Sequence, residues 1–339
     1  MTRISAAVRT IVGALALVCA IALLTPAAST AQVNPNAAAV SEEQLLNQSD
    51  VIRGLGTIPD TKSYVLEHPA GREWRVFRTV WLKWIGGVSI LGMLALLALF
   101  YFWRGTIHID GGRSGRTIVR FTAFERFVHW LTAAAFVILG VTGLNITFGR
   151  ALILPWLGHG AFSAWSEWGK YAHNYLSFAF TVGVILMFPM WVGQNFPTKA
   201  DVEWLKTGGG MFSKGHGAPA PAWKFNAGQK MLYWFIVLGG AAMMVTGYVL
   251  IFPFYGGLTV GDMELAEIFH GGIGVLFVAL ILAHTYLGTL GMEGAFESMV
   301  DGTVDVNWAK EHHPLWADKE MAQQPLAGGP GLVTSTPAE

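Results

Sequence analysis

The chain has 339 residues, of which 53% are hydrophobic and only 13% are charged, about half the charged fraction of an ordinary soluble domain. Basic and acidic residues number 22 each, so no positive excess is available to attract nucleic acid. The single cysteine, Cys19, excludes disulfides, iron–sulfur clusters and cysteine-rich zinc sites, all of which need several thiolates. The composition therefore predicts a membrane protein whose metal or redox chemistry would depend on histidine.

The N-terminus has the pattern of a secretory signal peptide. Arg3 and Arg9 precede an apolar run over 11–24, and small residues up to Ala31 give a Ser-x-Ala cleavage pattern. We expect cleavage after Ala31, with an uncleaved signal anchor as the alternative. Residues 32–78 are polar and have no strong periodicity, so we expect an irregular, exported segment there.

Five apolar segments follow, each near the length of about 20 residues that a bilayer-spanning helix needs. They run over 81–103, 127–148, 171–192, 231–254 and 266–292. An exported N-terminus and five crossings place the C-terminus in the cytoplasm. The basic residues of the loops over 104–126 and 199–230 agree, because cytoplasmic loops are enriched in Lys and Arg. Basic residues at the outer end of the first segment, Arg72, Arg75, Arg78 and Lys83, conflict with this pattern.

Four of the ten histidines fall inside these segments, where ionisable side chains are costly and usually functional. His270 and His284 share the fifth segment. Their spacing of fourteen residues keeps them within about 40° of one helix face and about 21 Å apart along it. The topology pairs His173 with His270 near the outer surface, and His129 with His284 near the inner surface.

Two stacked pairs of histidines in a helical bundle predict two b-type haems, each with both axial positions filled by imidazole. Such an iron transfers electrons and does not bind oxygen. Glycines near the histidines would let a flat macrocycle approach: Gly140, Gly143, Gly271, Gly272 and Gly274. The alternative is that each histidine only hydrogen-bonds to a neighbouring helix. The other six lie in loops or tails and are expected to be solvated: His68, His108, His159, His216, His312 and His313.

Stretches outside the haem histidines carry a family resemblance. Residues 195–205, 224–234 and 308–316, together with Phe127-Val-His-Trp130 and Leu282-Ala-His-Thr-Tyr286, resemble the gamma (cytochrome b556) subunits of membrane-bound formate dehydrogenases. These subunits form a family of diheme cytochromes b, and the resemblance covers about 117–320. It implies the same four histidines as axial ligands of two haem b groups. It also implies a quinone site near the inner haem at Asn226 and Gln229.

Asn226 and Gln229 also fit a capping box for the fourth spanning helix, with Asn226 as N-cap and Gln229 at the third helical position. The two roles are compatible. Quinone reduction takes two electrons and two protons, so polar side chains and access to water are needed beside the inner haem.

The sequence thus predicts an all-α membrane protein, a four-helix transmembrane cytochrome b bundle with an additional N-terminal transmembrane helix. The expected parts are a signal peptide (1–31), an exported segment (32–78), the additional helix (79–104), the diheme domain (105–295) and a cytoplasmic tail (296–339). The mature N-terminus would be periplasmic, in a bacterial inner membrane.

The resemblance implies the membrane subunit of a formate dehydrogenase, which passes electrons from an iron–sulfur beta subunit to menaquinone or ubiquinone. Formate oxidation would belong to an alpha subunit with a molybdenum or tungsten pterin. The alternatives are the cytochrome b subunit of a membrane hydrogenase or thiosulfate reductase, or a membrane anchor or transporter with structural histidines.

Overall fold

The computed structural model describes residues 69–211 and 219–323, so the expected signal peptide, His68 and His216 lie outside the described residues. Within these residues, five helices are long and apolar enough to cross a membrane. They run Gly71–Arg104, Ala123–Leu152, Leu154–Gln194, Ala227–Ile251 and Val260–Gly291. The expected all-α fold with four bundle helices and one additional N-terminal helix is confirmed.

The first span consists of α3 (Pro69–Val76), a π-helical turn η2 (Phe77–Trp81) and α4 (Leu82–Arg104). It begins at Pro69 and not at residue 79, since proline suits the first turn of a helix. The basic residues at this end have an acidic partner on α10 (Val260–Tyr286). Glu267 pairs with Arg78 at 3.1 Å and accepts a hydrogen bond from Trp74 at 3.1 Å. Part of the conflicting charge is therefore offset within the protein.

Capping boxes start three of the other four spans, because side chains there satisfy backbone N–H groups that lack a partner within the helix. Thr122 and Glu125 begin α5 (Ala123–Leu152), and Thr259 and Asp262 begin α10. Asn226 and Gln229 begin α8 (Ala227–Trp234), as expected. This helix continues through η5 (Phe235–Gly239) into α9 (Gly240–Ile251), and α10 continues into η7 (Leu287–Gly291).

The third span is longer than expected. Helix α6 (Leu154–Trp191) begins well before residue 171, is kinked at Gly158, whose φ is 72°, and ends in the short helix η3 (Val192–Gln194). Gly158 accommodates this left-handed backbone because it has no Cβ. The loop expected between the second and third segments is thus mostly helical.

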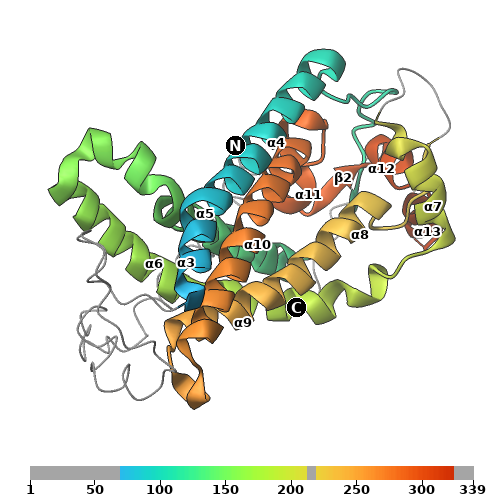
Figure 1. Ribbon diagram of the computed structural model, residues 1–339. Helices are drawn as coiled ribbons and strands as arrows, with labels where there is room; N and C mark the ends of the chain where they lie inside the picture. Colours follow the sequence, from blue (N-terminus) through green and yellow to red (C-terminus); the bar gives the residue numbers. More distant parts are fainter. Residues whose placement is uncertain (1–68, 212–218, 324–339) are drawn as a thin grey trace, which may run out of the picture.

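The spans pack in a simple order. Helix α5 lies against α6, and α10 lies between α4 and α9 (Figure 1). The α5–α6 contact buries a cluster of apolar side chains: Leu131, Ala135, Leu176, Ala179, Phe180 and Val184. A Cβ at Gly183 would collide with Thr132, so this glycine sets how closely the two helices approach.

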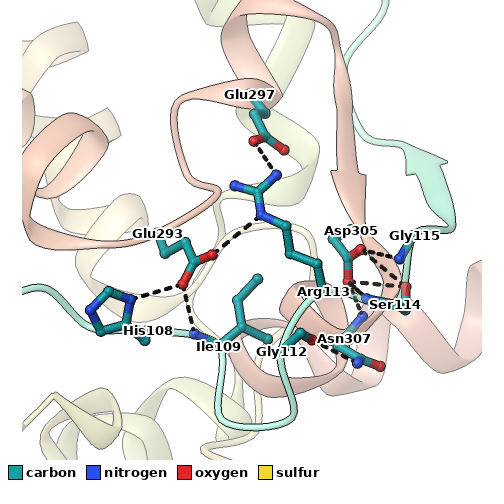
Figure 2. Close-up of polar contacts among 10 residues, drawn as sticks. All are labelled: His108, Ile109, Gly112, Arg113, Ser114, Gly115, Glu293, Glu297, Asp305 and Asn307. Atoms are coloured by element: carbon teal, nitrogen blue, oxygen red, sulfur yellow. Dashed lines mark hydrogen bonds and ion pairs between the residues drawn. The ribbon is translucent and has the colours of Figure 1, made fainter.

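One end of the bundle is closed by two segments far apart in the sequence, 105–120 and 291–305, which we call the clasp. Strand β1 (Thr117–Val119) pairs antiparallel with β2 (Thr303–Asp305), opposing Ile118 and Val304. Figure 2 shows the polar contacts beside this pair. Arg113 bonds Glu293 at 3.2 Å and Glu297 at 2.6 Å, and His108 bonds Glu293 at 3.0 Å.

Beyond α11 (Glu297–Val300) and β2, helices α12 (Val306–His312) and α13 (Pro314–Gln323) fold onto the clasp. Trp308 and Trp316 are buried in an apolar cluster with Ile109 and Ile118. The expectation of a solvated side chain is wrong for His313, which is 1% exposed because this tail packs against the bundle. His108, in contrast, keeps a side chain that is 74% exposed.

Candidate functional site

The four histidines of the spans lie in two pairs, as the topology predicts. On α6 and α10, the ring centroids of His173 and His270 are 6.2 Å apart with planes at 67°. On α5 and α10, those of His129 and His284 are 6.2 Å apart with planes at 64°. The second pair lies toward the clasp, and the first lies toward the opposite end of the bundle.

The first pair is held by two threonines in equivalent positions. Nδ1 of His173 lies 2.8 Å from the hydroxyl of Thr142, which donates its own proton to the carbonyl of Ile138. Nδ1 of His270 lies 3.0 Å from the hydroxyl of Thr246, which donates to Ala242. Because each hydroxyl proton is already used, each Nδ1–H donates to the threonine oxygen. This assigns the tautomer that leaves Nε2 free to bind a metal.

A glycine follows each threonine. A Cβ at Gly143 would lie 3.4 Å from Cε1 of His173, and one at Gly247 would lie 3.2 Å from Cε1 of His270. Both contacts are tight, so glycine lets each imidazole rest against its neighbouring helix. Sequence reasoning missed Thr142, Thr246 and Gly247, although the tripeptide Val-Thr-Gly recurs at 141–143 and 245–247 and could have revealed them.

One of the glycines expected beside a macrocycle, Gly271, packs against protein, whereas its neighbour Gly272 faces open space. A Cβ at Gly271 would lie 2.9 Å from Leu82, so this glycine serves the packing of α4 on α10. Gly272 has no atom near its Cβ position. The expectation is therefore wrong for Gly271, because the additional helix occupies that face of α10.

The separation within each pair fits a haem iron. An imidazole nitrogen binds a first-row metal at about 2 Å and its ring centre lies about 1 Å further, so two trans imidazoles have centres about 6 Å apart. Both observed separations match this value. In the second pair, Nδ1 of His129 is buried without a hydrogen-bond partner among the described residues. The donor set and spacing of both pairs thus suit axial ligation.

The family model described as prokaryotic cytochrome b561 matches residues 120–302, more than half of the chain. The chain belongs to this family. Membership implies b-type haem as the cofactor of this cytochrome and, with the five apolar helices, a multi-pass integral membrane protein.

Similar proteins carry a more specific name. The cytochrome b556(Fdn) subunit of the nitrate-inducible formate dehydrogenase of Escherichia coli K12 is 28% identical over 202 residues, 59% of this chain and 90% of that protein. The cytochrome b556(fdo) subunit of the same organism is 27% identical over 59% of this chain and 92% of its own length. The formate dehydrogenase cytochrome b556 subunit of Haemophilus influenzae is 27% identical over 60% of this chain and 84% of its own length.

In the cytochrome, Asn226 and Gln229 cap α8 at the clasp end. The Oδ1 atom of Asn226 accepts from the backbone N–H of Gln229 at 2.9 Å, and Oε1 of Gln229 accepts from the backbone N–H of Asn226 at 3.1 Å. Both side chains are half-buried. Among the described residues, their hydrogen bonds all use the oxygen atoms, so each amide NH₂ is left as a donor for a ligand.

Ion pairs flank this cap. Lys224 pairs with Glu125 at 3.0 Å, and Lys230 pairs with Asp201 of α7 (Lys199–Lys206) at 2.8 Å. Lys230 and Asp201 are both buried, so each charge depends on the other. These ion pairs place residues 224–230, which we call the cap segment, next to the His129–His284 pair, since Glu125 lies one turn before His129 on α5.

Proposed function

We propose that this cytochrome is the membrane subunit of a formate dehydrogenase and carries electrons from an iron–sulfur partner to quinone. His173 and His270 would hold one haem b, and His129 and His284 a second. When bound, the haems would supply a path for single electrons along the bundle. The observation that carries this proposal is the pair of imidazole separations, both 6.2 Å, in a chain of the cytochrome b561 family.

The partners are proposed from the relatives. The similar proteins from Escherichia coli and Haemophilus influenzae are named as formate dehydrogenase subunits. We infer that this chain also assembles with a beta subunit that carries iron–sulfur clusters and an alpha subunit that binds a molybdenum or tungsten pterin. Residues 105–295 would form the diheme domain, preceded by a cleaved signal (1–31), an exported segment that ends before Pro69 and a first helix that ends at Arg104.

The direction of transfer follows from the proposed topology. The loops with most basic residues lie at the clasp end, which therefore faces the cytoplasm of a bacterial inner membrane. Asn226 and Gln229 lie at the same end and would donate hydrogen bonds to the quinone carbonyl oxygens. Electrons would enter at the other end of the bundle. An electron moving inward would move against the membrane potential, at a cost of about 2.3 kcal/mol per 100 mV. Uptake of cytoplasmic protons by quinone would add to the charge separation.

Haem content of histidine variants tests the pairing. The purified full chain should contain two low-spin b haems in a reduced-minus-oxidised spectrum. His173→Ala and His270→Ala should each lose the same haem, and His129→Ala and His284→Ala should each lose the other. His159→Ala, which changes an exposed histidine of α6, is the control and should retain both.

The result that would overturn the pairing is loss of one and the same haem from His129→Ala and His270→Ala. A chain that folds without any b haem would instead support an anchor or transporter. Variants at His270 and His284 share a helix, so haem content is read only on protein that elutes as folded monodisperse material.

A further inference from the structure

Arg120 stands immediately before α5 and is 4% exposed. One terminal nitrogen of its guanidinium lies within hydrogen-bond distance of three acceptors: the Lys224 carbonyl at 2.7 Å, Oε1 of Gln229 at 3.4 Å and Nε2 of His313 at 2.9 Å. Its Nε is buried and has no partner among the described residues. The ring of Trp308 lies 4.9 Å from the guanidinium carbon. Arg120 thus connects the cap segment to the C-terminal tail.

All three acceptors are neutral. Nδ1 of His313 donates to the Trp223 carbonyl at 2.7 Å, so Nε2 carries the lone pair that accepts from Arg120. Burial and the charge of Arg120 hold the pKa of His313 well below its usual value. Within the described residues, no carboxylate forms an ion pair with Arg120, whereas Lys224 and Lys230 each have one. Among the described residues, the guanidinium of Arg120 therefore places one positive charge without an acidic partner against the cap segment.

This charge persists at neutral pH. Burial lowers the pKa of Arg120 to about 9, which still leaves the guanidinium protonated at pH 7. A buried charge without an acidic partner is costly, and proteins usually pair it. An arrangement that leaves it unpaired is favourable when a bound group becomes negative during the reaction.

Arg120 also fixes the direction of the Gln229 amide. The Oε1 atom of Gln229 faces both the Asn226 backbone N–H and Arg120, at 3.1 and 3.4 Å. Both contacts require an acceptor, so a flipped amide would present NH₂ to two donors. The NH₂ group must therefore point away from Arg120, where a ligand carbonyl could accept from it.

We propose that Arg120 is the positioning residue of the quinone site: it orients the Gln229 amide as a donor and supplies the positive charge that stabilises quinone after its first electron. The inference rests on the quinone site proposed at Asn226 and Gln229. Quinone that gains one electron is an anion. A second electron and two protons from water at the clasp end give the neutral quinol, so the fixed charge favours the intermediate over both end states.

The experiment compares charge-changing variants in the purified, haem-loaded full chain. The chain is reduced with dithionite, freed of excess reductant and mixed with menadione, a naphthoquinone probe. The rate of haem oxidation is followed by stopped flow, and the anionic quinone radical is quantified by electron paramagnetic resonance. Arg120→Gln should lower both the rate and the radical yield by roughly tenfold or more, since opposite charges a few ångströms apart near a protein surface attract each other by several multiples of thermal energy. Arg120→Lys should retain most of the oxidation rate and most of the radical yield.

A second pair of variants leaves Arg120 in place. His313→Glu puts a carboxylate against the guanidinium and should reproduce the loss in Arg120→Gln, because it cancels the charge from the opposite side. His313→Gln keeps a neutral acceptor and should behave like the unmodified chain. Haem content and melting temperature report folding in each case.

Several outcomes would overturn the inference. Equal losses in Arg120→Lys and Arg120→Gln, or in His313→Gln and His313→Glu, would leave only a structural role. Unchanged radical yield in Arg120→Gln and His313→Glu would exclude the charge effect. Gln229→Leu separates the two proposals. Normal quinone reduction by the Gln229→Leu variant would contradict the quinone site itself. Slower reduction by that variant, together with normal reduction by the Arg120 variants, would contradict only the role of Arg120.

Discussion

The hydroxyl oxygen of Thr142 on α5 lies 2.8 Å from Nδ1 of His173 on α6 and accepts a hydrogen bond from it. Such a contact makes the imidazole a more electron-rich ligand. Thr246 has the same relationship to His270 on α10. The haem proposed between these two histidines is thus tuned from both sides, whereas Nδ1 of His129 lacks a partner among the described residues.

Replacing Thr142 by Val should raise the midpoint potential of one haem. Valine keeps a similar shape but removes the acceptor, so His173 donates less electron density and the oxidised iron is less stabilised. A hydrogen bond of about 0.5–1.5 kcal/mol corresponds to a rise of about 20–60 mV. Potentiometric titration of the α-bands measures this. Thr147→Val is the matched control, because among the described residues that hydroxyl donates only to the backbone of Gly143. Equal shifts in both variants would contradict the prediction.

Gln229→Leu should separate haem reduction from quinone reduction. Leucine has a similar volume but no amide, so the donor to the quinone carbonyl is lost while the haem ligands are untouched. In the purified complex, formate should still reduce the haems, and electron transfer to quinone should fall about tenfold or more, the cost of removing one oriented donor. Asn174→Leu, on α6, is a control outside the cap. Normal quinone turnover would leave Gln229 with its capping role alone.

The buried ion pair of Lys230 and Asp201 should dominate the stability of the cap. Lys230→Met leaves a buried carboxylate unpaired, which costs about 3–5 kcal/mol. The melting temperature in detergent should therefore fall by several degrees. Lys206→Met is the control, since Lys206 and Glu203 form an exposed pair at 2.8 Å with side chains 65% and 57% exposed. A similar loss in both variants would contradict the role of burial.

This effect should depend on pH in a defined direction. Burial alone would raise the pKa of Asp201, but the hydrogen bonds from Lys230 and Thr198 outweigh it and the pKa is lowered. A lowered pKa stabilises the folded protein above the unfolded value of about 4, and this contribution is lost as pH falls through the folded value. The difference in melting temperature between Lys230→Met and the unmodified chain should thus narrow below about pH 4. A constant difference between pH 7 and pH 3 would argue against ionised Asp201 as the cause.

Fusions of a reporter test the proposed orientation. A fusion after Glu339 should behave as cytoplasmic, and an insertion near Gly257, in the short helix η6 (Tyr255–Gly257), should behave as exported. Alkaline phosphatase and green fluorescent protein give opposite readouts at the two positions. The reverse result at both would place the Asn226–Gln229 cap outside and invert the proposed path.

The sequence predicted the five spans and the two histidine pairs, although not every helix boundary, because apolar length and helical spacing are local features. Apolar length identifies a span, and fourteen residues between His270 and His284 keep them on one face. Long-range features outside the spans were not predicted. The burial of His313 depends on how α12 and α13 fold back, and the pairing of Ile118 with Val304 joins strands of three residues each. Strands this short have no usable alternation.

Arg120 shows why local pattern fails at the cap. In the sequence it is one of several basic residues in the loop between the first and second apolar segments. Its contacts with Gln229 and His313 come from segments more than a hundred residues away. Only their packing converts a loop arginine into a buried charge.

The clasp imposes an order on biosynthesis. Ile118 leaves the ribosome long before Val304, its partner across the β1–β2 pair, and at about 5–20 residues per second the delay is on the order of ten seconds or more. During that interval the last four spans must enter the membrane while residues 105–120 remain unpaired. Closure of the clasp therefore marks completion of insertion, and a chain stalled before residue 303 would leave Arg113 and its neighbours accessible to proteases on that side of the membrane.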